Sequence, residues 1–337
     1  MLIKVGIAGY GRMGKIRASA IDNNPDAKLT HIYDIELDNI DRADVEICNN
    51  YQQLLDADID AVFIAGYVKN SAEYTIRAIN AGKHVFCEKP PAINLTEMDG
   101  VKESFEASDR ILKYGFNHRF HYSVMEAKKV IDAGEIGDII LMRGVYGKAG
   151  SIDFEKNWRN YKEYSGGGIL IDQGIHMLDL FGFLSSEKLI CTGSMVRTLN
   201  WDIGCEDNVM AMFEADSGVI CSLHSSATQW KHTFMLEIIG KKGHIVLDGI
   251  LSSTMSYSPE KLVVGLLSDE RNDISMGKPA EKTYEFDKDD SWGLELSEFI
   301  QAIKKEGTVK NGSIYDSIDV MRLLGDVYAK NQLGVGK

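Results

Sequence analysis

The sequence predicts an N-terminal doubly wound α/β domain, followed by an α+β domain built on a large open antiparallel sheet. Up to about residue 118, short apolar segments alternate with helical patterns, as strands and helices alternate around a parallel sheet. Beyond that point, long segments alternate apolar and polar residues, which is the period of half-buried strands. The 337 residues fit two domains of roughly 150 residues each.

The first region has the pattern of a parallel sheet covered by helices. Apolar runs predict strands at residues 2–8, 28–34, 61–66, 84–88 and 111–115. Helical patterns lie between them, at 12–23, 51–60, 70–81 and 95–108. Connections of this kind are right-handed crossovers, so we expect parallel strands with helices on both faces. Residues 1–118 should form this domain.

After residue 118 the expected elements change. A helix at about 120–133 is followed by alternating strands at 138–148, 189–198, 208–227, 234–249 and 261–267. Turns such as Asp216-Ser217-Gly218 divide the longer segments into hairpins. Helical patterns return at 292–306 and 315–331. We expect residues 119–312 to bind substrate and mediate oligomerisation, and residues 313–337 to form a C-terminal helix that packs back on the first domain.

Composition argues against several classes of function. Lys and Arg number 37 and Asp and Glu number 50, so the formal net charge is −13, and such a surface repels nucleic-acid phosphates. No uncharged apolar run approaches the roughly 18 residues of a membrane helix, and the first residues show no signal-peptide pattern. The five cysteines are scattered. We expect reduced, mostly buried thiols in a cytoplasmic protein, without a disulfide framework or a bound metal.

A glycine-rich loop joins the first expected strand to the first helix. Its sequence is Gly9-Tyr10-Gly11-Arg12-Met13-Gly14, a G-x-G-x-x-G. The first glycine allows a tight turn, the second lets backbone N–H groups approach a pyrophosphate, and the third lets helix and strand pack closely. The helix N-terminus adds partial positive charge for the phosphates. The loop therefore predicts a Rossmann domain that binds a dinucleotide.

Asp34 lies at the end of the second expected strand, about 20 residues past the glycine loop. A carboxylate in this position accepts hydrogen bonds from the adenosine ribose and would repel the 2′-phosphate of NADP. The residues that follow, Ile35-Glu36-Leu37-Asp38, include no Arg or Lys to bind that phosphate. We therefore expect NAD rather than NADP, although a solvated aspartate or a mixed specificity would also fit the pattern.

The sequence Glu88-Lys89-Pro90-Pro91 follows the strand at 84–88. This is the carboxyl edge of the expected sheet, where ligands bind in folds of this kind. From there the ammonium group of Lys89 can donate a hydrogen bond to a substrate hydroxyl and polarise it. A lysine after a strand is also a common surface residue.

Three glycines, Gly166 to Gly168, precede an expected amphipathic helix that carries Asp172 and His176. Residues four apart project from one face of an α-helix. A carboxylate beside an imidazole suits a general base. The same spacing also suits an exposed ion pair, and we find no third ligand with the spacing of a metal site.

Five pieces of the sequence occur together in the order found in a known family. They are the glycine loop, AGKHVFCEKP, GFNHRF, AGEIGDI and GGGILIDQGIH. In this combination the chain resembles the Gfo/Idh/MocA oxidoreductases, the family of glucose–fructose oxidoreductase and inositol dehydrogenase. The resemblance covers nearly the whole chain. It implies a Rossmann domain, a C-terminal domain with a large open antiparallel sheet, a nicotinamide cofactor, and a sugar, polyol or nucleotide-sugar substrate.

The resemblance also implies roles for individual residues. Lys89, Asp172 and His176 match the catalytic group of inositol-dehydrogenase-like members: His176 would take the hydroxyl proton, Lys89 would stabilise the oxygen, and Asp172 would orient the pair. Cofactor contacts are expected from the glycine loop and from Asp34, Ile35, Ala65, Gly66, Tyr67, Glu88, Lys89 and Asn117. Substrate contacts are expected from the three catalytic residues and from Arg119, Asn157, Trp158 and Arg159, although core packing would also explain Trp158.

The chain departs from the family pattern after the strand at 61–66. Many members have Ser or Thr, any residue, Pro and then His, whereas this chain has Ala65-Gly66-Tyr67-Val68-Lys69-Asn70-Ser71. The loop on the nicotinamide side should therefore differ from the usual one. The doubled proline Pro90-Pro91 is a second, local variation, and neither change touches the three catalytic positions.

Two other functions are compatible with the sequence. Some relatives hold NAD tightly and cleave glycosides, because oxidation at one carbon permits elimination at its neighbour, and they recycle the NAD. One relative is a non-catalytic repressor that senses the dinucleotide, but the intact set of Lys89, Asp172 and His176 argues against this function. An NAD-dependent dehydrogenase or reductase acting on CH–OH groups is the leading interpretation.

Apolar residues on the expected strands predict a homodimer or homotetramer. Examples are Met210, Met212, Leu236 and Ile238. An open sheet needs a cover on each apolar face. Helices can cover one face, and a neighbouring subunit would cover the other. We expect a small-molecule substrate and neither a nucleic acid nor a membrane as a partner.

Overall fold

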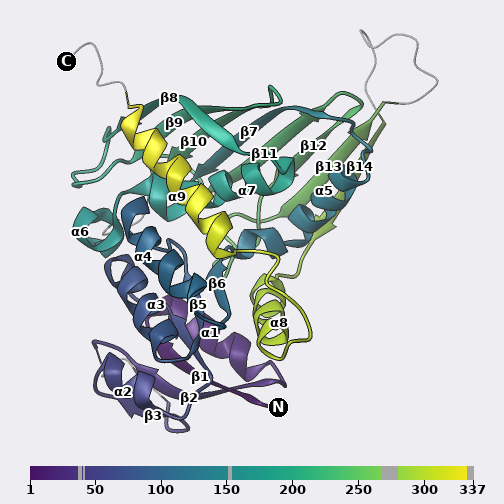
Figure 1. Ribbon diagram of the computed structural model, residues 1–337. Helices are drawn as coiled ribbons and strands as arrows, with labels where there is room; N and C mark the ends of the chain where they lie inside the picture. Colours follow the sequence, from purple (N-terminus) through teal and green to yellow (C-terminus); the bar gives the residue numbers. More distant parts are fainter. Residues whose placement is uncertain (37–39, 41, 151–153, 268–279, 332–337) are drawn as a thin grey trace. The chain divides into compact units, whose positions relative to one another are not determined.

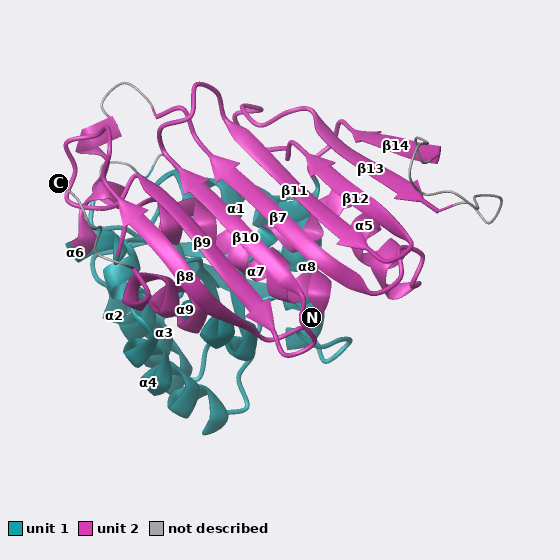
Figure 2. Cartoon of the chain, turned by 90° about the horizontal axis from the view of Figure 1, so that it is seen from above, with its two compact units in different colours: residues 1–117, 163–166, 290–321 teal, residues 118–162, 167–289, 322–337 magenta. Residues whose placement is uncertain are grey.

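The computed structural model describes residues 1–36, 40, 42–150, 154–267 and 280–331 (Figure 1). The chain divides into two compact units, coloured separately in Figure 2. The first unit comprises residues 1–117, 163–166 and 290–321, and the second comprises residues 118–162, 167–289 and 322–337. Each unit contains one sheet, and the expected pair of a doubly wound α/β fold and a sheet-based α+β fold is confirmed.

The first unit is built on a six-stranded parallel sheet in the order β3-β2-β1-β4-β5-β6. The strands are β1 (Ile3–Ala8), β2 (Ala27–Tyr33), β3 (Glu46–Cys48), β4 (Ala61–Ile64), β5 (His84–Glu88) and β6 (Leu112–Gly115). The order reverses between β1 and β4, and ligands of such sheets bind at the carboxyl ends of the strands beside this reversal. The sequence did not predict β3, because three residues are too few to show a period.

Helices complete the first unit, among them the start of a helix that continues into the second. They are α1 (Arg12–Asp22), α2 (Tyr51–Asp56), α3 (Ser71–Asn80), α4 (Leu95–Glu106), α8 (Ser291–Ile303) and residues up to 321 of α9 (Ile314–Ala329). Asparagine side chains cap two of them. Asn50 accepts a hydrogen bond from the Gln53 N–H at the start of α2, and Asn94 accepts one from the Glu97 N–H at the start of α4.

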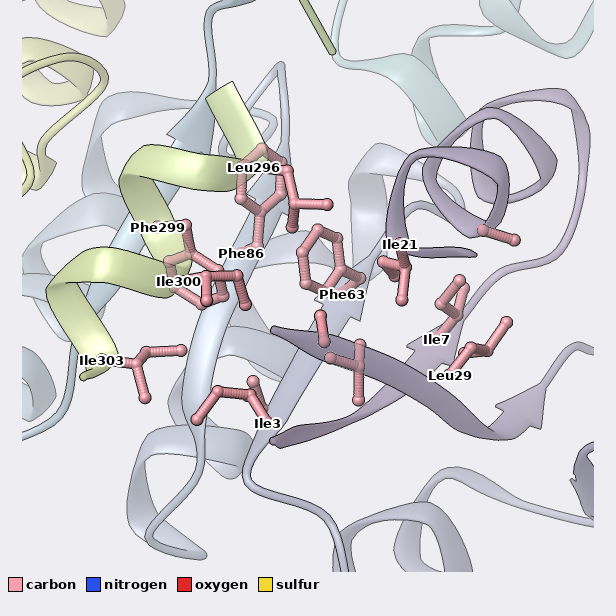
Figure 3. Close-up of a cluster of buried hydrophobic side chains, with 14 of the residues drawn as sticks. Ile3, Ile7, Ile21, Leu29, Phe63, Phe86, Leu296, Phe299, Ile300 and Ile303 are labelled. Atoms are coloured by element: carbon pink, nitrogen blue, oxygen red, sulfur yellow. The ribbon is translucent and has the colours of Figure 1, made fainter. Parts of the chain in front are cut away.

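The division of the chain differs from the expected boundaries at residues 290–312. We expected this segment in the second domain, but α8 packs in the core of the first unit (Figure 3). The ring of Phe299 meets the stacked rings of Phe63 and Phe86 edge-on, with centroids 5.6 Å from each. A helical period shows that a helix has an apolar face, but it does not show which sheet that face covers.

A buried ion cluster joins three elements of the first unit. Arg17 of α1 has no exposed surface. Its Nε lies 2.6 Å from Glu88 Oε1, at the end of β5, and its Nη2 lies 2.7 Å from Glu295 Oε2 of α8. The guanidinium also lies over the rings of Phe86 and Trp292. The cluster therefore holds the end of the strand from which Lys89 follows.

The second unit is built on an eight-stranded sheet in the order β14-β13-β12-β11-β7-β10-β9-β8. The strands are β7 (Ile139–Gly147), β8 (Leu189–Arg197), β9 (Asn208–Ala215), β10 (Ile220–Ser226), β11 (Thr233–Gly240), β12 (Gly243–Asp248), β13 (Glu260–Leu266) and β14 (Ala280–Phe286). The pairing of β7 with β10 is parallel and the other pairings are antiparallel. The sequence did not predict β14, because its residues are mostly exposed and polar.

The two faces of this sheet differ. Helices α5 (Tyr122–Asp132) and α7 (Ile175–Ser185) cover one face, and Figure 2 shows the strands from the other side. Leu236 and Ile238 point to the covered face and are fully buried, whereas Met210 and Met212 are about half exposed, at 49% and 57%. The four residues were expected to contribute alike to apolar faces that need a cover, but the alternation along the strands separates them.

All five cysteines are buried and none forms a disulfide. Burial raises the pKa of both Cys87 and Cys221 to about 12, so these thiols stay protonated at neutral pH. None of the helices in the described part of the chain combines the length and apolar character that a membrane crossing requires. The short helix α6 (Lys162–Ser165) spans the boundary between the two units.

We expect Arg17→Met to lower the free energy of unfolding by about 3–5 kcal/mol, because it leaves two carboxylates buried without their cation. Lys129→Met is the matched control. Lys129 pairs with Glu126 on the surface, where such a pair contributes about 1 kcal/mol or less. Urea unfolding monitored by circular dichroism measures both changes. If Arg17→Met costs no more than the control, the cluster does not hold α1, β5 and α8 together.

Candidate functional site

The glycine loop has the close approaches that its sequence requires. Gly9 adopts a left-handed backbone conformation with φ +97°, and a Cβ there would lie 2.5 Å from the Gly66 nitrogen. A Cβ on Gly14 would lie 2.1 Å from the Gly9 carbonyl oxygen. At Gly11, the N-cap of α1, a Cβ would meet nothing within 4 Å. The loop thus packs against its own sheet at two glycines and leaves backbone open at the third, which fits a pyrophosphate.

Asp34 directly follows β2 and is tied to the glycine loop. Its Oδ2 accepts a hydrogen bond from the Tyr10 N–H, and its Oδ1 accepts one from the Glu36 N–H at 2.8 Å. The Gly9 N–H also donates to the Tyr33 carbonyl at 2.8 Å. The carboxylate therefore lies beside the loop, as a ribose contact requires. Ile35 is 59% exposed, and Leu37 and Asp38 lie outside the described residues.

The segment that departs from the family pattern forms an aromatic and cationic cluster. After β4 the chain passes through Ala65 and Gly66 to Tyr67 and a 3₁₀ turn, η2 (Val68–Asn70). The Tyr67 ring lies 5.3 Å from the Tyr164 ring, and Lys69 Nζ lies 4.0 Å from the centroid of Tyr164. Tyr164 belongs to the first unit. No such cluster was expected, because nothing in the sequence around 65–71 points to residue 164.

The remaining residues expected near the cofactor lie at the ends of β5 and β6. Glu88 is buried in the Arg17 cluster, and half-buried Lys89 follows it. The peptide bond between Lys89 and Pro90 is cis. Asn117 is buried, and its Nδ2 donates to the Ser291 hydroxyl at 3.3 Å.

In the second unit, a buried carboxylate holds the triple-glycine turn. Glu206 Oε1 accepts hydrogen bonds from the N–H groups of Gly168 and Leu170 at 2.9 and 3.1 Å, and from the Tyr328 hydroxyl at 2.9 Å. Burial raises the pKa of Glu206, while these donors favour its charged form. A Cβ on Gly168 would lie 2.1 Å from the Glu206 carbonyl oxygen. Sequence reasoning missed Glu206, because no local motif surrounds it.

The helix that carries Asp172 and His176 differs from the expected one. Residues Leu170–Gly174 form a π-helical turn, and α7 begins only at Ile175. Every residue from 175 to 181 is buried, so α7 is not amphipathic, which corrects the prediction. A π turn contains more residues than an α turn. The spacing of four therefore does not place the two side chains as it would in a regular α-helix, and each has partners of its own.

Asp172 is held by two cations of the second unit. Its Oδ2 lies 2.9 Å from Lys148 Nζ, and its Oδ1 lies 3.3 Å from Arg159 Nε. Lys148 directly follows β7, and its Nζ lies 4.9 Å from the centroid of Phe154. Arg159 was expected at the site, whereas Lys148 was missed, because a single lysine after an alternating strand carries no signal of its own.

His176 is buried and stacks on a second imidazole. The rings of His176 and His118 lie 3.7 Å apart at an interplanar angle of 16°. His118 belongs to the 3₁₀ turn η3 (Asn117–Phe120), and its Nε2 lies 3.0 Å from the Tyr146 hydroxyl. Burial raises the pKa of Tyr146, which keeps the phenol neutral. This arrangement fixes the plane of the His176 ring, and sequence reasoning missed both His118 and Tyr146.

The other residues expected at the substrate have varied placements. Arg119 is buried, and its Nε and Nη2 contact both carboxylate oxygens of Asp179 at 2.9 and 2.6 Å. Asn157 Oδ1 accepts a hydrogen bond from the Arg159 N–H. Trp158 is half-buried, with its ring 4.4 Å from the guanidinium of Arg159. Among the described residues no group of three His, Cys, Asp or Glu is arranged to hold a metal ion.

Two family models match the chain. A model described as an oxidoreductase family with an NAD-binding Rossmann fold matches residues 3–116, and the GFO/IDH/MocA C-terminal domain matches residues 124–246. Among curated proteins, myo-inositol 2-dehydrogenase of Thermotoga maritima is 28% identical over 270 residues, which are 77% of this chain and 79% of that protein. The scyllo-inositol 2-dehydrogenase (NAD(+)) of Bacillus subtilis is 29% identical over 257 residues, 73% of each chain.

Solved structures share the fold. Levoglucosan dehydrogenase in complex with NADH and levoglucosan has a TM-score of 0.86 at 23% identity, covering 98% of this chain and 97% of that chain. A 3-ketoreductase from Actinomadura kijaniata in complex with NADP and TDP-benzene has a TM-score of 0.83 at 20% identity, covering 98% of each chain. One of these neighbours was solved with NADH and the other with NADP.

Proposed function

Because this chain belongs to the GFO/IDH/MocA family of oxidoreductases, we propose that it is an NAD(H)-dependent dehydrogenase or reductase acting on CH–OH groups. Its substrate class is a sugar, a polyol or a nucleotide sugar. The observation that carries the proposal is His176, a buried imidazole held in a fixed plane by His118. A general base must present one nitrogen in one direction, and a ring stacked in this way meets that requirement.

The glycine loop and Asp34 fit the dinucleotide. The open backbone at Gly11 and the N-terminus of α1 would hold the pyrophosphate, and the Asp34 carboxylate would accept hydrogen bonds from the ribose. NAD, when bound, supplies the hydride acceptor of the reaction. Tyr67 and Lys69, in the segment after β4, are the residues through which this chain would differ from relatives on the nicotinamide side.

We assign proton transfer to His176 and polarisation of the substrate oxygen to Lys89. In oxidation, His176 takes the proton of the substrate hydroxyl, and in reduction it returns a proton to the carbonyl oxygen. The ammonium group of Lys89 donates a hydrogen bond to the same oxygen and stabilises the charge that develops on it. Asp172, held by Lys148 and Arg159, orients the polar groups around it.

We also propose that the protein forms a homodimer or homotetramer through the open face of the eight-stranded sheet. Five apolar side chains on β8, β9 and β10 are about half exposed there: Ile190, Met195, Met210, Met212 and Ile220. The register places Met195 beside Met210, so these side chains are neighbours on one surface. A contiguous apolar surface on an uncovered sheet favours association with a second copy.

His176→Ala should lower kcat by about a hundredfold or more, which is the usual effect of removing a positioned acid–base group. Lys89→Ala should do likewise. The affinity of the His176 variant for NAD should change little, because residue 176 lies outside the matched NAD-binding region. In the oxidation direction, wild-type turnover should rise with pH as the base loses its proton.

The measurement is NADH formation in a screen of polyols, sugars, sugar acids and nucleotide sugars. His244→Ala, on β12 and paired with Glu281, is the control and should retain activity. A His176 variant within a few-fold of wild type would refute the proton-transfer role. Substrate conversion without net consumption of NAD would instead indicate a glycosidase that recycles it.

The protein should bind NAD more tightly than NADP, because the Asp34 carboxylate would repel a 2′-phosphate. Asp34→Ala should reduce this preference. Glu36→Ala, two residues further on, is the matched control and should preserve it. Fluorescence titration with NADH and NADPH measures both affinities. Equal or tighter binding of NADPH by the wild type would overturn the cofactor assignment.

Sedimentation of the wild type should show a dimer or tetramer at micromolar concentration. Replacing both Met210 and Met212 with glutamate should shift the population toward monomer, since the added charges would have to be desolvated at the interface. As a control, substituting both Glu281 and Glu285, which are exposed on β14, should leave the dimer or tetramer intact. A monodisperse wild-type monomer would rule out the proposed assembly.

A further inference from the structure

Two cationic side chains contact the carboxylate of Asp172, four residues before the proposed base. Lys148 Nζ and Arg159 Nε take the two oxygens of Asp172, at 2.9 and 3.3 Å. Among the described residues neither cation pairs with a second carboxylate. The three side chains keep 16%, 34% and 17% of their surface exposed, for Lys148, Arg159 and Asp172 respectively. Water and small ligands can therefore reach an excess of positive charge there, in a chain whose net charge is −13.

Both cations have donors beyond those that Asp172 uses. An ammonium group carries three N–H donors and a guanidinium carries five. The pair with Asp172 uses Nε of Arg159, so the two Nη groups that bind carboxylate or phosphate as a fork are outside that pair. The guanidinium lies 4.4 Å from the ring of Trp158, a contact that favours one orientation of the charged group.

Neutral polar groups also lie around Asp172. Gln173 Nε2 donates to the Tyr257 hydroxyl at 2.6 Å, and burial raises the pKa of Tyr257 so that the phenol stays protonated. Burial and Lys148 together lower the pKa of His232, whose ring lies 4.8 Å from Tyr257. Neutral donors and acceptors of this kind suit the hydroxyls of a sugar. The excess positive charge at Lys148 and Arg159 is not matched by a neutral hydroxyl.

We propose that the substrate is an anionic sugar, and that Lys148 with Arg159 binds its phosphate or carboxylate group. The inference rests on the proposed function and narrows its substrate class. A negatively charged group would match the charge that Asp172 leaves uncompensated, and two of its oxygens would accept the fork of Arg159. An uncharged polyol would offer the two cations only neutral hydroxyl acceptors, which replace their hydration less well than an anion does. Lys148 thereby becomes a specificity-determining residue that no local motif marks.

A purely structural role for Lys148 predicts a different pattern of ligand affinities. If the lysine only held Asp172 in place, its removal would weaken charged and uncharged ligands in the same proportion. The informative quantity is therefore the ratio of the affinities for an anionic sugar and for its uncharged counterpart.

The experiment uses four compounds that share one ring: glucose, glucose 6-phosphate, glucuronate and UDP-glucose. Each is titrated calorimetrically into the full-length protein saturated with NADH, so that the dinucleotide site is filled. We expect at least one anionic compound to bind tenfold or more tightly than glucose, and this advantage should fall as NaCl is raised from 50 to 300 mM. The arm that responds identifies the anion as a phosphomonoester, a carboxylate or a diphosphate. If none of the three anionic compounds binds more tightly than glucose, the proposal is overturned.

Lys148→Met and Arg159→Met should each reduce the ratio of anionic to neutral affinity at least tenfold, and Lys148→Arg should restore most of it. Lys261→Met, which removes a surface cation paired with Glu285 on the same sheet, should leave the ratio unchanged. If both methionine variants lose affinity for glucose and for the anionic compound by the same factor, the role of the cations is structural and the proposal is refuted. Thermal unfolding confirms that each variant is folded.

Turnover then separates this proposal from the proposed function. Oxidation of uncharged polyols alone, with no anion preference, would support the oxidoreductase function and refute the anion site. The opposite result is also informative. If an anionic sugar binds in a way that Lys148→Met weakens, but no compound in the wider screen transfers hydride to NAD, the anion site is supported and the redox function is refuted.

Discussion

The first unit depends on a guanidinium that has no access to water. Arg17 must keep both of its carboxylates, because a buried cation without them is costly. Its partners are Glu88 at the end of β5 and Glu295 on α8, so one ionic contact links the helix behind the glycine loop to the strand that ends at Lys89. The glycine loop and the Glu88-Lys89 motif are therefore parts of one rigid arrangement rather than two separate motifs.

In the second unit, a polar turn directly precedes a buried helix. Residues 175–181 are buried on all sides, so the polar groups of the preceding turn need partners within the protein. Glu206 binds the N–H groups of the glycine turn, Lys148 and Arg159 bind Asp172, and His118 stacks on His176. Each partner restricts one side chain or turn to a single orientation, which is what catalysis by positioned groups requires.

The two clusters differ in how their charges are balanced. At Arg17 one cation contacts two carboxylates in a buried site, so no positive charge is left over for a ligand. At Asp172 two cations contact one carboxylate in a site that water can reach. The first arrangement stabilises the fold and the second is suited to a ligand, because only an exposed and uncompensated charge can gain from binding an ion of opposite sign.

The sequence by itself determined most strands of both sheets, the glycine loop and the place of Asp34, because periodicity and short spacings are local properties of the chain. It did not show β14, whose exposed polar residues have no apolar period, and it did not show which sheet α8 covers. Tertiary structure decided the partners of the polar groups: Lys148 lies 24 residues from Asp172, and Glu206 lies 36 residues from Leu170. A single lysine or glutamate acquires its role only when the fold brings a distant partner within hydrogen-bonding distance.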